Sequence, residues 1–335
     1  MIDSETVVGT GLRITVSRDE LAAKLGVVSR AVSTRATVLV LGGIQLQAAD
    51  ARLELSATDM ELSLRAAVDA RVADEGTVVV PGRLLLDIAR SLPESEVSIE
   101  HRPDEAVVVV TSGSATYRLH TYSAEDFPRL PDIATLTLHA VDGEALVETV
   151  TRVGRSASRD ESRPVLTGIL VRFEPGKIVM AATDSYRLAV KETSIEGPLP
   201  ELEAIIPARA LQELSRIAGD AGEVQLGLHE NHVVFGTDGV WLTTRRIDGQ
   251  FPNYRQLLPE QFEHELTLPR EELLDVVRRV SLMAQRNSPL RLRFADGELT
   301  VSAVTQDVGE ARESLPAPFG SDPLEIGRAS CRERV

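Results

Sequence analysis

The segment Leu166-Thr167-Gly168-Ile169 is a second copy of Leu41-Gly42-Gly43-Ile44, and 125 residues separate position 43 from position 168. Three other landmarks repeat at that interval to within one residue. They are Ala57-Thr58-Asp59 with Ala182-Thr183-Asp184, Val80-Pro81-Gly82-Arg83 with Ile206-Pro207-Ala208-Arg209, and Asp126-Phe127-Pro128 with Gln250-Phe251-Pro252. Separated landmarks in one register indicate duplicated structural units. The sequence therefore predicts a chain of repeated domains.

Each copy has the same order of predicted elements. An amphipathic helix comes first, at 18–33 and again at 144–154, because apolar residues recur there every three or four positions. Short alternating strands follow, and a second helix then begins with Pro81 or Pro207 in its first turn. The turns predicted between strands include Asp69-Ala70, Pro175-Gly176 and Asp238-Gly239. We predict α+β domains, each with two helices packed on antiparallel sheets of about eight strands in all.

A third copy begins near Glu265. It has a predicted helix at 270–284, a strand at 290–294, and a turn at Ala295-Asp296-Gly297 leading into a strand at 298–303. By the same period this copy would extend about 50 residues beyond the last residue, so we expect the third domain to be incomplete and only about half present. The predicted domains are 11–135, 136–260 and 261–327.

The segment at the end of the chain, GRASCRERV, has no apolar periodicity and holds three arginines and the only cysteine. We interpret residues 328–335 as a non-native tail and exclude them from the fold prediction. A native tail without fixed structure is the alternative.

Composition limits the classes of function. Lys and Arg total 36 against 51 Asp and Glu, giving a net charge of −15, so overall charge does not favour binding to a polyanion. Any nucleic-acid contact must therefore use locally gathered positive charge. A single cysteine cannot form an internal disulfide, and the N-terminal residues lack the basic and apolar pattern of a signal peptide. With no long apolar run, we expect a soluble, cytoplasmic protein.

Arginines recur on the predicted helices despite the acidic composition. They are Arg83 and Arg90 in the first copy, Arg152, Arg155, Arg159 and Arg163 in the second, and Arg278, Arg279 and Arg286 in the third. One shared face that contacts DNA phosphates would explain this recurrence, and such contacts are sequence-independent and sensitive to salt. For any single helix, a solvated polar face remains the alternative.

Taken together, these residues resemble the bacterial sliding clamp, the beta subunit of DNA polymerase III. The resemblance extends from Arg13 to about Gly327. Its most specific segments are Arg163-Pro164-Val165-Leu166-Thr167-Gly168, Thr183-Asp184-Ser185-Tyr186-Arg187-Leu188-Ala189-Val190 and Asp248-Gly249-Gln250-Phe251-Pro252-Asn253-Tyr254-Arg255-Gln256-Leu257-Leu258-Pro259.

The resemblance implies a non-catalytic processivity factor without a cofactor. Two chains would form a head-to-tail ring around duplex DNA, with helices lining the hole and sheets outside. Such a homodimer would hold the replicative polymerase on its template during DNA replication. The alternative is a peptide-docking hub that never encircles DNA.

The same resemblance implies residues that contact DNA and residues at the ring seam. Arg35 matches a DNA-contacting arginine after the first helix, and Arg163 lies in a loop that faces DNA in relatives. Helix position alone adds Arg83, Arg152, Arg155, Arg209, Arg279 and Arg286. The residues matching apolar contacts of the seam are Tyr117, Leu119 and Leu282.

A second implied site is a groove that takes short linear peptides from polymerase III alpha subunit, the clamp loader and repair proteins. The matching positions are Leu166, Thr183, Tyr186, Arg187, Leu188, Pro252 and Leu257, with Gln256 where some relatives have arginine. Leu166, Leu188 and Leu257 would form an apolar floor, and Arg187 would donate hydrogen bonds at the rim. Ordinary core packing is the alternative for each leucine. The remaining wall would come from the part of the third domain that we expect to be missing.

Two other patterns carry less weight. His229 and His232 are three residues apart, but they flank a predicted turn and lack further metal ligands, so no metal is expected. Asp59 and Asp184 could suggest a metal-dependent nuclease. Their equivalent positions in separate domains favour a role at the end of a strand instead.

Overall fold

The computed structural model describes residues 11–33, 38–196, 201–219, 221–284, 289–306 and 308–329. It divides into two compact units, which meet in the sequence at Pro252 and Asn253. The first unit contains two copies of the repeat, here called the first module (β1 to β8) and the second module (β9 to β16). The second unit contains the third copy.

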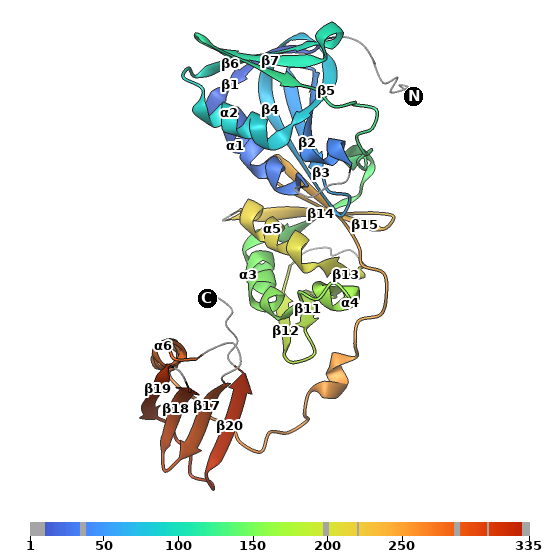
Figure 1. The fold of residues 1–335 in the computed structure, drawn as a ribbon. Coiled ribbons are helices and arrows are strands. Elements are labelled where there is room, and N and C mark those ends of the chain that lie inside the picture. The colour runs from blue at the N-terminus through green and yellow to red at the C-terminus, as the bar shows by residue number, and fades with distance from the viewer. Residues whose placement is uncertain are drawn as a thin grey trace. The chain divides into compact units, whose positions relative to one another are not determined.

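The first module contains eight strands and two α-helices in the order expected (Figure 1). Its elements are β1 Arg13–Ser17, α1 Arg18–Val28, β2 Gly43–Ala49, β3 Arg52–Thr58, β4 Leu62–Asp74, β5 Gly76–Pro81, α2 Gly82–Ser91, β6 Glu96–Arg102, β7 Val107–Ser112 and β8 Ala115–His120. Short 3-10 turns follow α1 at Ser29–Ala31 (η1) and precede β2 at Leu39–Gly42. All strand pairs are antiparallel.

The second module repeats this order, again with eight strands. Its elements are β9 Leu138–Asp142, α3 Gly143–Val153, η5 Gly154–Ser156, α4 Pro164–Thr167, β10 Gly168–Glu174, β11 Lys177–Thr183, β12 Leu188–Ser194, β13 Glu203–Pro207, α5 Ala208–Ala218, β14 Glu223–His229, β15 His232–Thr237 and β16 Val240–Arg245. The expected α+β class and duplicated architecture are therefore confirmed in the first unit.

Helix α3 shows why the helices form at these positions: a side chain caps its start, and its apolar face packs into the core. The Asp142 side chain accepts a hydrogen bond from Ala145 N at 2.7 Å and caps α3. Leu146, Val150 and Val153 then recur on one face and are buried. In each module the two helices contact one another, α1 with α2 and α3 with α5 (Figure 1).

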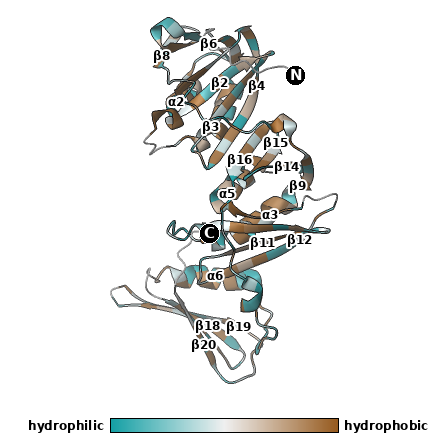
Figure 2. Ribbon diagram, turned by 90° about the vertical axis from the view of Figure 1, so that its right-hand side faces the viewer, coloured by the Kyte–Doolittle hydropathy of each residue, from teal (hydrophilic) through white to brown (hydrophobic). Residues whose placement is uncertain are grey.

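One continuous sheet joins the two modules. Strand β16 pairs with β4, with Leu242 opposite Leu64 and Val240 opposite Ala66. The connected path runs β8-β7-β6-β1-β4-β16-β15-β14-β9. The buried side chains of both modules also form one core cluster, so the apolar core continues from one repeat to the next. Figure 2 shows hydrophobic residues on the strands and on the helices that cover them.

The second unit has its own core. It contains η6 Tyr254–Leu257, α6 Arg270–Ser281 and a four-stranded sheet in the order β19-β18-β17-β20. The strands are β17 Pro289–Ala295, β18 Glu298–Thr305, β19 Gly309–Pro316 and β20 Leu324–Ala329. Val276 and Val280 of α6 pack with Leu299 and Val301 of β18. The predicted turn is confirmed, because Asp296 and Gly297 adopt positive φ between β17 and β18.

Several predicted element bounds were wrong. Helix α1 ends at Val28 rather than at residue 33, because the chain tightens into the 3-10 turn η1. Helix α6 ends at Ser281 rather than at residue 284. Pro81 and Pro207 are N-caps with extended ψ, so each proline precedes the first helical turn.

The predicted turn at Asp69-Ala70 was also wrong, because β4 continues from Leu62 to Asp74. Strand β4 changes partner at this point. Asp69 pairs with Arg52 of β3, whereas Ala70 pairs with Val16 of β1. A polar residue beside a small one therefore marks where β4 changes from β3 to β1 as its neighbouring strand. The turns at Pro175-Gly176 and Asp238-Gly239 are confirmed.

The excluded tail overlaps the sheet. Strand β20 extends to Ala329, with Gly327 opposite Arg291 and Ala329 opposite Pro289. Excluding residues 328 and 329 from the fold was therefore wrong, because their backbone pairs with β17. The rest of the interpreted tail lies outside the described residues.

Candidate peptide-binding loop and DNA-facing helices

The loop between β11 and β12 is held by hydrogen bonds from its own side chains. Thr183 Oγ1 donates to the Arg187 carbonyl at 2.7 Å and accepts from Ser185 N at 3.1 Å. Asp184 Oδ1 accepts from the backbone N–H of Tyr186 and of Arg187, each at 3.0 Å. Ser185 adopts a positive φ of 77°. These bonds fix the backbone of the loop and direct Tyr186 outward, with 92% of its surface exposed.

The first module contains the same loop between β3 and β4. Thr58 Oγ1 donates to the Leu62 carbonyl at 3.2 Å and accepts from Met60 N at 3.0 Å. Asp59 Oδ1 accepts from Glu61 N and Leu62 N, and Met60 has the same φ of 77°. The sequence repeat is thus also a repeat of hydrogen bonds. Asp59 and its counterpart in the second module each cap their own loop, as expected for residues at strand ends.

The electrostatics of the second loop favour an ionised Asp184. Burial opposes the charge, but the backbone N–H groups of Tyr186 and Arg187 and the Arg187 guanidinium outweigh it and lower the pKa of Asp184. The guanidinium Nε lies 3.1 Å from Asp184 Oδ2. Arg187 is therefore bound to the carboxylate of its own loop.

The other predicted groove residues have different environments. Leu166, at the end of α4, is buried, and Leu188, at the start of β12, is half-buried. Thr183 is buried in the loop described above, and Pro252 is exposed. Gln256 and Leu257 belong to η6 of the second unit, where Leu257 is 68% exposed. In the first unit Arg163 Nη1, directly before α4, donates to Ser185 Oγ at 3.1 Å and so joins the segment of Leu166 to the loop that carries Tyr186.

Four of the predicted DNA-contacting arginines form ion pairs. Arg152 contacts Glu148, Arg163 contacts Asp160, Arg209 contacts Asp59 and Arg279 contacts Glu313, at distances of 2.5 to 3.1 Å. Among the residues that the structure describes, Arg83 and Arg155 are exposed and have no carboxylate partner. Arg35 and Arg286 lie outside the described residues. Exposed ion pairs contribute little to stability, so these arginines can exchange partners.

The predicted seam residues occupy an edge strand and a helix end. Strand β8 forms the edge of its sheet, pairing with β7 alone. Tyr117 on this strand is exposed, whereas Leu119 is 4% exposed and belongs to the core. Leu282, directly after α6, is 80% exposed. Tyr117 and Leu282 are therefore available for contacts, and Leu119 supports the strand from inside.

Polar residues at the module junction were not predicted. Arg30 Nη1 of η1 lies 3.3 Å from Glu213 Oε2 of α5, and Lys24 Nζ donates to the Asp238 carbonyl at 3.0 Å. The Glu213 side chain is only 12% exposed. A glutamate between the apolar positions Leu211 and Leu214 was the available sequence signal, because a carboxylate on a buried helix face requires a partner.

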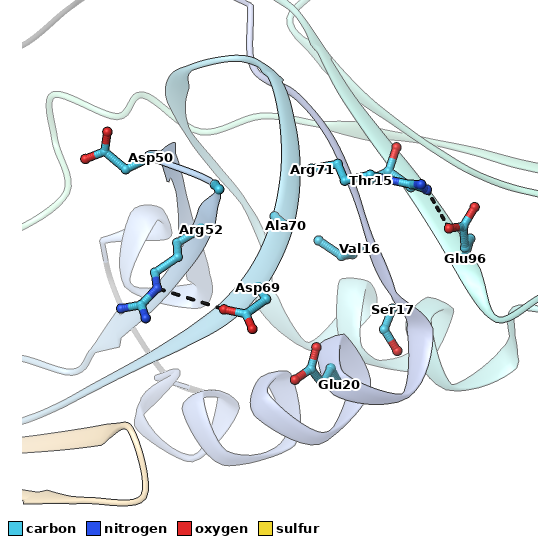
Figure 3. A pocket seen from close by; sticks show the side chains of 11 residues that line it. Thr15, Val16, Ser17, Glu20, Asp50, Arg52, Asp69, Ala70, Arg71 and Glu96 are labelled. Carbon is cyan, nitrogen blue, oxygen red and sulfur yellow. Dashed lines mark hydrogen bonds and ion pairs between the residues drawn. The ribbon is translucent and has the colours of Figure 1, made fainter.

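A pocket of about 510 Å³ lies on the first module, between the start of α1 and the turn that joins β2 to β3 (Figure 3). Its walls are mixed in charge: Arg52 pairs with Asp69, and Arg71 pairs with Glu96. These ion pairs neutralise both arginines. In the described part of the chain, no group of three or more His, Cys, Asp or Glu side chains could hold a metal ion. No helix among the same residues is long and apolar enough to cross a membrane.

Family models match the three copies in turn. DNA polymerase III beta subunit, N-terminal domain, matches residues 12–131; the central domain matches 140–253; and the C-terminal domain matches 255–330. The expectation of a third domain that is only half present is not confirmed, since the third model matches this segment and the segment folds around its own core.

Individual relatives agree with these matches. The beta sliding clamp of Streptomyces coelicolor is 35% identical over 94% of this chain and 85% of its own length. That of Micrococcus luteus is 36% identical over 91% of this chain and 99% of its own length.

Solved structures of clamps have the same fold. The sliding clamp of Bacillus subtilis superposes with a TM-score of 0.89 at 26% identity, covering 95% of this chain and 87% of that one. The Bartonella birtlesii clamp, solved with griselimycin bound, gives 0.86 at 29% identity, covering 96% and 88%. With its duplicated modules and its matched loops, the chain belongs to the family of bacterial beta sliding clamps, the non-catalytic beta subunits of DNA polymerase III.

Proposed function

We propose that this chain pairs head to tail with a second copy to form a ring around duplex DNA, and that the ring tethers the replicative polymerase. The observation that carries the proposal is the β4–β16 ladder, which joins two repeated modules edge to edge into one sheet. A ring needs modules that add in this way, and the exposed edge of β8 offers a further strand for pairing. Tyr117 on that edge would contribute to the seam.

The DNA contacts in this proposal are weak and independent of sequence. Exposed arginines on and beside the helices would contact phosphates, with Arg83 and Arg155 as the members without a carboxylate partner in the described structure. The arginines that hold an ion pair, Arg152, Arg163, Arg209 and Arg279, must exchange a carboxylate for a phosphate. An encircled duplex cannot leave sideways, so a ring needs no strong contacts and slides more easily without them.

The partner peptides in this proposal bind at the loop after β11. Tyr186 and the half-buried Leu188 would contact an apolar anchor residue, and the buried Leu166 would support them. The proposed partner classes are the leucine- or phenylalanine-containing tail of polymerase III alpha subunit, clamp-loader peptides and repair peptides.

The first experiment measures the solution mass of the full chain by light scattering over a concentration series. A mass near twice 36.4 kDa supports the ring. A mass that stays at the monomer value at all concentrations contradicts it.

The second experiment tests topology. The chain is placed on nicked circular duplex with a clamp loader, and the circle is then linearised. A ring should be lost from the linear form, and equal retention on both forms would refute encirclement.

A peptide-docking hub that does not encircle DNA is the second candidate function. The 92% exposure of Tyr186 on a rigid loop favours it, because this loop belongs to the first unit alone. A monomeric chain that still binds the polymerase peptide would support the hub against the ring.

A further inference from the structure

A small crease lies between the two helices of the second module. Its volume is about 250 Å³. One side is formed by α3 and η5, and the other by α5. The lining residues are Val150, Thr151, Gly154, Arg155, Gln212, Ser215 and Arg216. Two arginines from opposite sides, with hydroxyl and amide groups between them, make a donor-rich surface of the kind that binds phosphate.

The carboxylate of Glu213 already holds one of these arginines. Arg216 Nη1 donates to Glu213 Oε1, and Arg30 Nη1 of the first module lies 3.3 Å from Oε2. The two oxygens of one buried carboxylate thus bind arginines from two modules. Arg216 keeps 60% of its side chain exposed, so solvent and ligands still reach it. Glu213 is the anion that Arg216 contacts when no DNA is bound.

The first module has the equivalent residues, but its carboxylate is not buried. By the repeat, Arg30 and Arg90 correspond to Arg155 and Arg216, and Asp87 corresponds to Glu213. Arg90 Nη2 lies beside Gly26 of α1, where an added Cβ would meet it at 3.4 Å. Asp87 is exposed and, within the described residues, has no arginine partner. The repeat therefore keeps both arginines but buries the acid in the second module only.

We infer that Glu213 is a built-in competitor of the DNA phosphate for Arg216. In the bound state a backbone phosphate lies in the crease between Arg155 and Arg216, while Glu213 retains Arg30 and so keeps the module junction intact. Competition lowers the affinity for each phosphate in turn, which keeps the contact short-lived while the duplex moves past. The inference rests on the proposed function, because it takes duplex DNA as the ligand.

The test uses fluorescence anisotropy with two labelled 20-base-pair duplexes of unrelated sequence, between 50 and 200 mM KCl. Glu213→Gln should bind both duplexes about three- to tenfold more tightly at 50 mM, because Arg216 then has no internal anion. Arg216→Gln should bind about threefold more weakly. The slope of log affinity against log salt concentration should become shallower by the amount expected for about one lost phosphate contact. The double variant should behave like Arg216→Gln alone.

Glu203→Gln is the matched control. It removes one negative charge from β13, where Glu203 pairs with Arg172 instead of lining the crease. Equal tightening by Glu203→Gln and Glu213→Gln would overturn the inference, since a change in net charge would then explain both. Tightening that persists in the double variant would also overturn it.

Two further readouts keep the test decisive. If Glu213→Gln loses its fold because Arg30 is left without its partner, the exposed Arg216→Gln variant still decides, and unchanged affinity and salt slope there contradict the inference. Failure of the proposed function has a different signature. In that case the chain stays monomeric in light scattering and is retained equally on circular and linear DNA, whereas failure of the inference alone leaves those two results intact and the affinities of the variants equal to that of the parent.

Discussion

Replacing Thr183 with valine keeps the shape of a β-branched side chain and removes one buried hydroxyl. Thr183 is 7% exposed, and its Oγ1 forms two hydrogen bonds, at 2.7 Å to the Arg187 carbonyl and at 3.1 Å to Ser185 N. Each bond contributes about 1 kcal/mol net, and leaving a partly buried partner unsatisfied costs about 1 kcal/mol more. We therefore expect Thr183→Val to lower the free energy of unfolding of the first unit by about 2 to 3 kcal/mol.

The assay is urea unfolding followed by tryptophan fluorescence. The chain has one tryptophan, Trp241 on β16, so the signal reports the first unit alone. With a slope of about 2 to 3 kcal/mol per molar urea, the midpoint should fall by about 1 M. Thr58→Val removes the equivalent hydroxyl of the first module and should behave alike. Thr116→Val, on the exposed edge strand β8, is the control without such bonds. A Thr183→Val midpoint equal to that of the control would refute the assignment of stability to this loop.

Three other outcomes are expected. Arg187→Ala combined with Leu188→Ala should weaken binding of a leucine- and phenylalanine-containing polymerase peptide at least about tenfold, since each lost anchor contact costs about 1 kcal/mol or more; an unchanged anisotropy titration would place the groove elsewhere. The lowered pKa of Asp184 adds stability above the pKa of its unfolded form, and that stability is lost as pH falls through the folded value. Urea midpoints between pH 6 and pH 2 should therefore fall less in Asp184→Asn than in the parent, and parallel curves would contradict this. Gly236→Ala places a Cβ 2.4 Å from the Trp241 ring and should destabilise the first unit by about 1 to 3 kcal/mol, measured by the same fluorescence; a loss under 0.5 kcal/mol, about the scatter of surface substitutions, would be inconsistent with that contact.

The sequence predicted the modules well because periodicity and turn residues act locally. The helix at Gly143–Val153 and the hairpin turn at Asp238-Gly239 follow from apolar spacing and from residues that tolerate positive φ. The long strand through Asp69 was missed, since polar and small residues also occur where a strand changes partner. Nothing in the local pattern shows that one strand pairs with different neighbours along its length.

The candidate site was predicted less completely, because charge partners depend on tertiary structure. Repetition located the loop at Thr183 and the arginines on the helices. It did not reveal that Arg209 would bind Asp59 of the neighbouring module or that Glu213 would bridge two arginines. The Arg209–Asp59 and Arg30–Glu213 pairs join residues more than 100 positions apart, so they follow from the β4–β16 seam and not from spacing along one helix.

The β4–β16 seam also has a consequence for synthesis on the ribosome. Strand β4 emerges long before β16, since Ala66 pairs with Val240. At a synthesis rate of about 5 to 20 residues per second, the edge of β4 stays unpaired for roughly 10 to 35 s until β16 has been made. An unpaired edge invites pairing with other chains, and charged side chains discourage it. Arg65, which contacts Glu54 at 3.7 Å, lies within the waiting edge. A neutral, apolar residue at position 65 would leave the nascent chain open to misassembly before the second module exists.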